Sequence, residues 1–163
     1  MGFIRIKKIN GKEYAYLVEN KWYKRGFKSK GKGSRQTVSK YLGRVYKFDK
    51  VIVDKDFFQY KHINDGQQYL VDNSYDKIIK DLIRWELYRH NIDSNEYKID
   101  FGNKKVKQNS KLISIKINEG FLNNYTLRRL FNPKKDNSLY LAKCFVEAGI
   151  EVPKEVFVGL FSD

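Results

Sequence analysis

The chain has few of the residues that build disulfides and metal centres. Of its 163 residues only one is cysteine, Cys144, and only two are histidine, His62 and His90. A single cysteine cannot form an internal disulfide, which fits a reducing compartment, and it excludes a zinc site built on cysteines. The histidines do not stand at metal-ligand spacing from each other or from Cys144. The sequence therefore predicts no metal and no cofactor.

Long hydrophobic runs are also missing. No segment reaches the roughly 20 apolar residues that a membrane span needs. Near the N-terminus Arg5, Lys7 and Lys8 interrupt the apolar residues, so this segment lacks the core of a signal peptide. We expect a cytoplasmic protein with no membrane partner.

Acidic residues are scarce in the first third of the chain. Residues 1–50 contain 15 Lys/Arg against 3 Asp/Glu, a net charge of +12, whereas residues 51–163 contain 18 against 16, a net charge of +2. A solubility effect would not need such an asymmetry, so the uneven charge favours a polyanionic partner: DNA, RNA or an anionic surface. Hydrophobic residues make up 41% of the chain, which is enough for a core.

The basic segment begins with a predicted β-hairpin. Strands over residues 3–9 and 12–20 flank Asn10-Gly11, a strong signal for a type I′ turn. This turn fixes a register that sends two sets of side chains to opposite faces. The apolar set comprises Ile4, Ile6, Ala15 and Leu17, and the polar set comprises Arg5, Lys7, Tyr14 and Tyr16.

A loop rich in Gly and Lys (21–33) and a third strand (35–42) follow, and Gly43 is expected to end that strand. Alternation puts Val38 and Leu42 on the apolar face of the predicted sheet. It puts Arg35, Thr37, Ser39 and Tyr41 on the polar face.

This polar face and its loop form the candidate nucleic-acid interface. Arginines can contact guanine edges, lysines can neutralise phosphates, and Tyr14 and Tyr16 can stack on unpaired bases. The candidate residues are Arg5, Lys7, Tyr14, Tyr16, Lys24, Arg25, Lys28, Lys30, Lys32, Arg35, Thr37, Lys40 and Tyr41. The plainer alternative is a half-buried hairpin whose Tyr and Lys side chains cover the rest of the protein.

The pattern "IRIKKINGKEYAYLVE…RQTVSKYLGRV" resembles the N-terminal segment of some insertion-sequence DDE transposases. There a Y-x-Y-L-V-E strand follows a Lys-rich hairpin and precedes R-Q-x-V-x-K-Y-L-G. The matching residues here are Tyr14, Tyr16, Leu17, Val18, Glu19, Arg35, Gln36, Val38, Lys40, Tyr41, Leu42 and Gly43.

The resemblance covers residues 3–45 and implies a DNA-binding β module; arm-type binding modules of integrases are similar more loosely. It does not extend to catalysis, because the remaining residues are too few for a DDE domain. Asp54 stands on a strand-like run but has no acidic companions in the expected context.

Helix and strand signals alternate in residues 51–163. They predict a helix from Asn73 or Ser74 to about His90, a hairpin around Gly102-Asn103 and a strand over 111–117. Helices are expected over 121–131 and over 138–148, the latter closed by Gly149, and Pro153 can start a short turn or helix. Residues 51–58 form a strand or a connection, and 62–68 form a loop.

The predicted fold class is α+β. A three-stranded antiparallel sheet module (1–50) binds nucleic acid, and a small α+β module with C-terminal helices (51–163) acts as a scaffold, dimerises or docks a protein partner. The predicted function is non-enzymatic nucleic-acid binding, with DNA preferred. RNA binding, including association with the ribosome, and a protein-interaction adaptor are alternatives.

Two further motifs offer other chemistry. Glu96 and Lys98 form the E-x-K pattern of a Mg²⁺-dependent nuclease, but Asp93 is too close to serve as its upstream aspartate and Asp81 falls on a predicted helix. Arg128 and Arg129 could belong to a helix-turn-helix, although the pattern favours packing by neighbouring leucines with both arginines in solvent.

The remaining singled-out residues have structural explanations. Cys144 and Trp85 fit the core, His90 fits the end of a helix, and Trp22 stands at a strand end.

Overall fold

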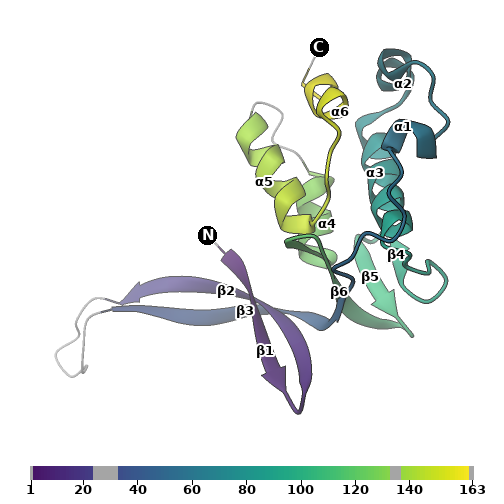
Figure 1. Ribbon diagram of the computed structural model, residues 1–163. Helices are drawn as coiled ribbons and strands as arrows, with labels where there is room; N and C mark the ends of the chain where they lie inside the picture. The colour runs from purple at the N-terminus through teal and green to yellow at the C-terminus, as the bar shows by residue number, and fades with distance from the viewer. Residues whose placement is uncertain (1, 24–32, 133–136, 162–163) are drawn as a thin grey trace, which may run out of the picture.

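The computed structural model describes residues 2–23, 33–132 and 137–161, and it is a mixed α+β structure (Figure 1). Seven strands form one mixed sheet in the order β1-β2-β3-β6-β5-β4, with β7 paired to β6. The strands are β1 (Gly2–Ile9), β2 (Lys12–Tyr23), β3 (Gly33–Lys47), β4 (Lys98–Asp100), β5 (Lys105–Gln108), β6 (Lys111–Ile117) and β7 (Gly120–Leu122). The helices within the described ranges are α1 (Phe57–Tyr60), α2 (Gly66–Asp72), α3 (Tyr75–Arg89), α4 (Asn124–Leu130), α5 (Ser138–Ala148) and α6 (Lys154–Gly159).

The first hairpin matches its sequence signal. Asn10 and Gly11 have φ of 51° and 77°, as a type I′ turn requires. The register places Arg5 opposite Tyr16 and Lys7 opposite Tyr14. The predicted turn and register of β1 and β2 are therefore confirmed, although β2 runs on to Tyr23, into the predicted loop.

The third strand departs from regular alternation. At two places β3 advances by two residues while β2 advances by one, and Ser39 and Leu42 are the extra residues of these bulges. Each bulge reverses the alternation of the residues beyond it. Val38 consequently lies opposite Val18, on the face of Tyr16, while Leu42 is buried on the other side. The prediction that Val38 and Leu42 share the apolar face is wrong.

Gly43 continues the strand instead of ending it. Its φ is 99°, and a Cβ at this position would lie 2.4 Å from the carbonyl oxygen of Leu112 in β6. A residue without a side chain lets β3 pass this close to β6. The two strands then pair in parallel from Arg44 opposite Ile113 to Lys47 opposite Lys116.

The three N-terminal strands are thus part of a larger sheet. They are antiparallel to one another, as expected, but β3 joins them to β6. A boundary between two modules near residue 50 stays a prediction from the sequence. The stretch from 51 to 56 contains no strand and connects β3 to α1.

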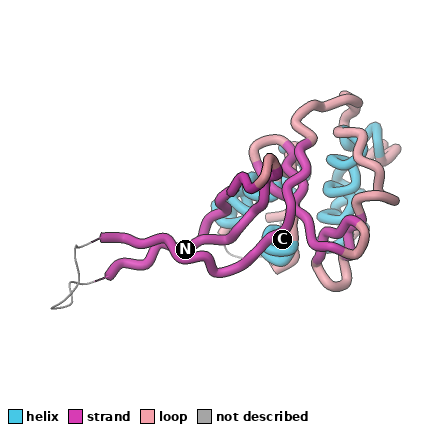
Figure 2. Tube along the Cα trace, turned by 90° about the horizontal axis from the view of Figure 1, so that it is seen from below, coloured by secondary structure: helices cyan, strands magenta, loops and turns pink. Residues whose placement is uncertain are grey.

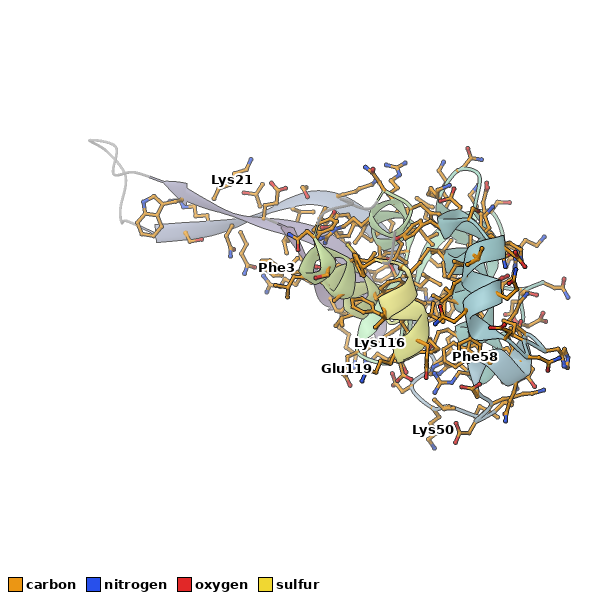
Figure 3. All side chains as sticks on the ribbon, turned by 90° about the horizontal axis from the view of Figure 1, so that it is seen from above. Phe3, Lys21, Lys50, Phe58, Lys116 and Glu119 are labelled. Atoms are coloured by element: carbon orange, nitrogen blue, oxygen red, sulfur yellow. The ribbon has the colours of Figure 1, made fainter. Side chains whose placement is uncertain are left out.

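A two-stranded arm projects from this sheet. β1 pairs with β2 only as far as Glu19, so residues 20–23 pair solely with residues 33–36 within the described chain. We call these two stretches the arm. Figures 1 and 2 show it extending away from the helices. In Figure 3 Lys21 lies along the arm and Phe3 lies close to its root, while Lys50, Lys116 and Glu119 lie on the body.

Several C-terminal elements agree with the sequence signals. The Oγ of Ser74 caps α3 by accepting from the backbone N–H of Lys77, and His90 follows the last residue of this helix. Gly149, with φ of 73°, closes α5, and α6 begins directly after Pro153. β4, β5 and β6 also lie where they were expected.

Two C-terminal expectations are wrong. The predicted loop at 62–68 contains the start of α2, whose cap is Asp65 accepting from the N–H groups of Gln67 and Gln68. The helix expected from residue 121 begins only at Asn124, because residues 120–122 pair with β6 as β7.

Two clusters of buried side chains hold these elements together. The larger one lies between the helices and β5, β6 and β7, and it includes Trp85 and Cys144 as expected. The smaller one lies at the root of the arm, where Ala15, Leu42 and Val45 pack with the predicted apolar face and with Phe121 and Tyr125. Among the helices of the described residues, none is both long and apolar enough to cross a membrane.

Candidate nucleic-acid interface

A row of three tyrosines lies on the outer face of the N-terminal strands. Cross-strand partners share a face of a sheet. Tyr16 lies opposite Tyr41 in the short stretch between the two bulges. The ring centroids of Tyr16 and Tyr41 are 5.3 Å apart, and those of Tyr14 and Tyr41 are 6.4 Å apart. We call Tyr14, Tyr16 and Tyr41 the tyrosine row. Its members come from two strands and form one continuous aromatic surface.

Cations border the tyrosine row on the side of β1. The Nζ of Lys7 lies 5.0 Å from the ring centroid of Tyr16, at cation–π distance. Arg5 donates from Nη1 to the Oε1 of Gln36, a residue of the arm. The predicted set Arg5, Lys7 and the tyrosine row therefore forms a single surface.

A groove lies at the root of the arm, beyond the tyrosine row. It has a volume of about 640 Å³ and runs between the β2–β3 pair and the β5–β6 hairpin. We call it the root groove. Its lining residues are Lys12, Tyr14, Tyr41, Arg44, Tyr46, Gln108, Asn109, Lys111, Leu112 and Ile113. The groove exists because β3 joins β6 only from Arg44 onward, so the two hairpins diverge on the other side of Gly43.

In the root groove the guanidinium of Arg44 stacks on the ring of Tyr46. The guanidinium of Arg44 lies 5.0 Å from the ring centroid of Tyr46, and Tyr46 also contacts Tyr97 edge-on with 5.5 Å between centroids. Arg44 is also the cross-strand partner of Tyr14. Aromatic rings thus line the groove on the side of β2 and on the side of β3.

The surface is strongly electropositive. No Asp or Glu occurs between Glu19 and Asp49 in the sequence, and the groove lining defined above contains no carboxylate. Glu13 is engaged by Lys47, with 2.9 Å between Nζ and Oε2. Burial, followed by the neighbouring hydroxyls of Tyr16 and Tyr14, raises the pKa of Tyr41, which keeps its hydroxyl protonated and able to donate.

Three of the predicted site residues lie on the opposite face. The bulges pair Arg35 with Lys21, Thr37 with Glu19 and Lys40 with Leu17, which places them on the side away from the tyrosine row. The prediction that Arg35 and Thr37 share a face with Tyr41 is wrong, and Lys40, predicted as a site residue, also lies away from that face. Arg35 still lies on the arm, where a two-stranded ribbon exposes both of its faces.

Lys40 belongs to a separate basic cluster near α4. Partial burial, followed by the charges of Arg128 and Lys105, lowers the pKa of Lys40. None of the ion pairs found in the described part of the chain includes Lys40, Lys105 or Arg128.

Five further predicted residues lie outside the described residues. They are Lys24, Arg25, Lys28, Lys30 and Lys32.

The root groove itself was missed at the sequence level. Arg44 and Tyr46 follow the glycine that was expected to end the strand, and Lys111 and Asn109 come from a distant hairpin. The alternation of Arg44, Val45 and Tyr46 carried a signal that the strand continues. Nothing local predicted that β5 and β6 would stand beside it.

The residues of the E-x-K pattern, Glu96 and Lys98, lie in a separate groove from the tyrosine row. Glu96 and Lys98 border a polar groove together with Asp100 and Lys107. The Oε1 of Glu96 accepts from Gln108, and hydrogen bonds from Asn103 lower the pKa of Asp100. Within residues 2–23, 33–132 and 137–161 no group of three or more His, Cys, Asp or Glu could hold a metal ion.

The arginine pair on α4 is split. Arg128 is exposed as expected, but Arg129 forms an ion pair with Glu147 and stacks on Tyr125 at 5.4 Å and on Tyr140 at 5.2 Å. The expectation that both arginines lie in solvent is wrong for Arg129. Leu127 and Leu130 are fully buried, as the helix pattern indicated.

Comparison with models of protein families, with curated proteins and with solved structures found no match to this chain. The resemblance of residues 3–45 to a transposase segment stays a prediction from the sequence.

Proposed function

We propose that this protein binds duplex DNA without catalysing a reaction, and that its arm enters the major groove. The observation that carries the proposal is the two-stranded ribbon projecting beyond the body (Figures 1 and 2). The major groove of B-form DNA is wide enough for a two-stranded β-ribbon. The A-form RNA groove is too deep and narrow for side chains to reach bases, so the shape of the arm favours DNA.

Charge supports the same assignment. Lys21 and Arg35 lie opposite each other on the arm, and the sequence between them adds five more cations and no acid. Arg5 and Lys7 add two cations at the root of the arm, on the opposite face of the sheet from Lys21 and Arg35. Cations along both edges of a ribbon can meet the phosphates on either side of the groove.

Salt-titrated binding tests the proposal. Fluorescence anisotropy with a 20-bp duplex DNA, the same duplex as RNA and a single strand measures affinity against salt concentration. DNA is expected to bind tightest. The double variant Lys21→Glu, Arg35→Glu is expected to weaken DNA binding at least tenfold and to reduce the slope of log K against log salt by about two units.

A matched double variant controls for net charge. Lys50→Glu with Lys154→Glu makes the same change of charge on exposed side chains of the body. It should change affinity by less than threefold. Failure to bind any nucleic acid, equal loss in both double variants, or a clear preference for RNA would each overturn the proposal.

A further inference from the structure

The root groove has features that binding of a duplex by the arm does not use. It lies on the face of the tyrosine row, next to the place where the arm leaves the body. Its volume of about 640 Å³ is typical of sites that enclose a small organic group. A continuous duplex is a convex surface and would cover the groove without filling it.

The walls of the groove suit a flat ring. Tyr14 and Tyr41 line it from the hairpin, and Tyr46 lines it with Arg44 stacked at 5.0 Å. Tyr41 is 46% exposed, which leaves room for a ligand to contact it. Aromatic and guanidinium planes are the surfaces on which unpaired bases stack.

The remaining lining supplies groups for the polar parts of a nucleotide. Gln108 and Asn109 carry amides that can pair with the edge of a base. Lys12 and Lys111 carry exposed ammonium groups that can neutralise the adjoining phosphates. Rings, amides and cations are therefore combined in one concave site with no carboxylate in its lining.

We propose that the root groove binds an unpaired nucleobase of a single strand that continues from the duplex held by the arm. This inference rests on the proposed function. The preferred ligand is then DNA with a single-stranded extension, because Arg5, which donates to Gln36 of the arm, and Lys7, which lies opposite Tyr14 of the groove, occupy the face between the arm and the groove. A free nucleotide would use only the groove and none of that surface.

The test compares a blunt duplex with the same duplex carrying a five-nucleotide single-stranded extension. One set of extended duplexes carries 2-aminopurine at the first unpaired position, whose fluorescence is quenched by stacking. The protein is expected to bind the extended duplex about tenfold tighter than the blunt one and to quench the 2-aminopurine. Adenosine and thymidine monophosphates serve as competitors and should not displace the extended duplex at equimolar concentration.

Variants locate the effect in the groove. Tyr41→Leu removes the ring and is expected to reduce the preference for the extended duplex to less than twofold. Tyr41→Phe keeps the ring and should retain the preference. Lys111→Gln lies away from the tyrosine row and should reduce the preference two- to threefold, which gives a second readout if Tyr41→Leu folds poorly.

The outcomes separate the two proposals. Equal binding of blunt and extended duplexes, with no quenching, overturns the groove assignment and leaves duplex binding in place. Efficient competition by a mononucleotide overturns the assignment to a polymer. The absence of binding to either duplex overturns the proposed function.

Discussion

Asp81 shows how a single buried charge is held in α3. Only 1% of this residue is exposed, and its carboxylate accepts from the hydroxyl of Tyr69 at 2.8 Å and from the Nζ of Lys77 at 2.8 Å. Lys61 adds an ion pair at 3.3 Å. Burial alone would raise the pKa of Asp81, but these donors outweigh it and hold the pKa below its usual value.

Replacing Asp81 is expected to cost stability. Asp81→Asn leaves Lys77 and Lys61 without their acceptor charge, so the free energy of unfolding should fall by about 3 kcal/mol at neutral pH. Urea denaturation measures this change in the free energy of unfolding. Asp76→Asn, an exposed change in the first turn of the same helix, should stay within about 0.5 kcal/mol.

The carboxylate of Asp81 should also make the stability of the protein depend on pH in acid. A folded-state pKa below the unfolded one contributes stability that is present above the unfolded pKa, 3.8, and is lost as pH falls through the folded pKa. Denaturation at a series of pH values below 5 should show this loss in the natural protein. Asp81→Asn should remove that part of the slope, and an unchanged slope would contradict the assignment.

Cys144 should be chemically inert in the folded protein. It is 1% exposed, and burial is the main cause that raises the pKa of its thiol, so little thiolate is present and reagents cannot reach it. A chromogenic disulfide reagent at pH 8 is expected to react completely in concentrated guanidinium chloride and at least a hundredfold more slowly in buffer. Rapid reaction in buffer would show that α5 opens locally.

At the scale of elements, the close crossing of β3 and β6 depends on Gly43. Gly43→Ala combines a positive φ with a Cβ placed 2.4 Å from a backbone oxygen, so the free energy of unfolding should fall by about 2–4 kcal/mol. Gly33→Ala, in the same strand with no heavy atom within 4 Å of the added carbon, should change it by less than about 1 kcal/mol. Chemical denaturation of the two variants decides between these expectations.

The elements that were predicted correctly are those whose signals are local. Asn10-Gly11 fixed the turn and register of the first hairpin, and Ser74 and Gly149 marked a helix start and a helix end. These residues act through their own φ angles or through hydrogen bonds within one turn of backbone.

The elements that were missed depend on distant contacts. The bulges at Ser39 and Leu42 arise where β3 must bury Leu42 and still reach β6. Strict alternation of side chains along a strand assumes that no residue is inserted, so it cannot predict a bulge. Arg35 and Thr37 were therefore placed on the wrong face, and the root groove was not found. The tyrosine row on β2 and β3 and its neighbours Arg5 and Lys7 on β1 could be predicted from alternation and register, whereas the root groove needed the pairing of β3 with β6.

At the scale of the whole molecule, binding and folding should be separable. No arm residue belongs to either buried cluster, and Glu19 lies opposite Thr37, so residues 20–36 can be replaced by Asn-Gly. The shortened protein is expected to keep its circular dichroism spectrum and to melt within about 4 °C of the full chain. Its affinity for duplex DNA should fall more than tenfold, and unchanged affinity would show that the arm is not the contact.

The parallel pairing of β3 with β6 also sets the order in which the strands can form during synthesis. Arg44 pairs with Ile113, which lies roughly seventy residues later in the chain. A long loop must therefore close before this contact can form. During synthesis the first hairpin and β3 can form from their own residues, but residues 44–47 of β3 then stay without their partner strand until β6 leaves the ribosome. For that interval the nascent chain displays an unpaired strand edge, which is the form most prone to joining a neighbouring chain.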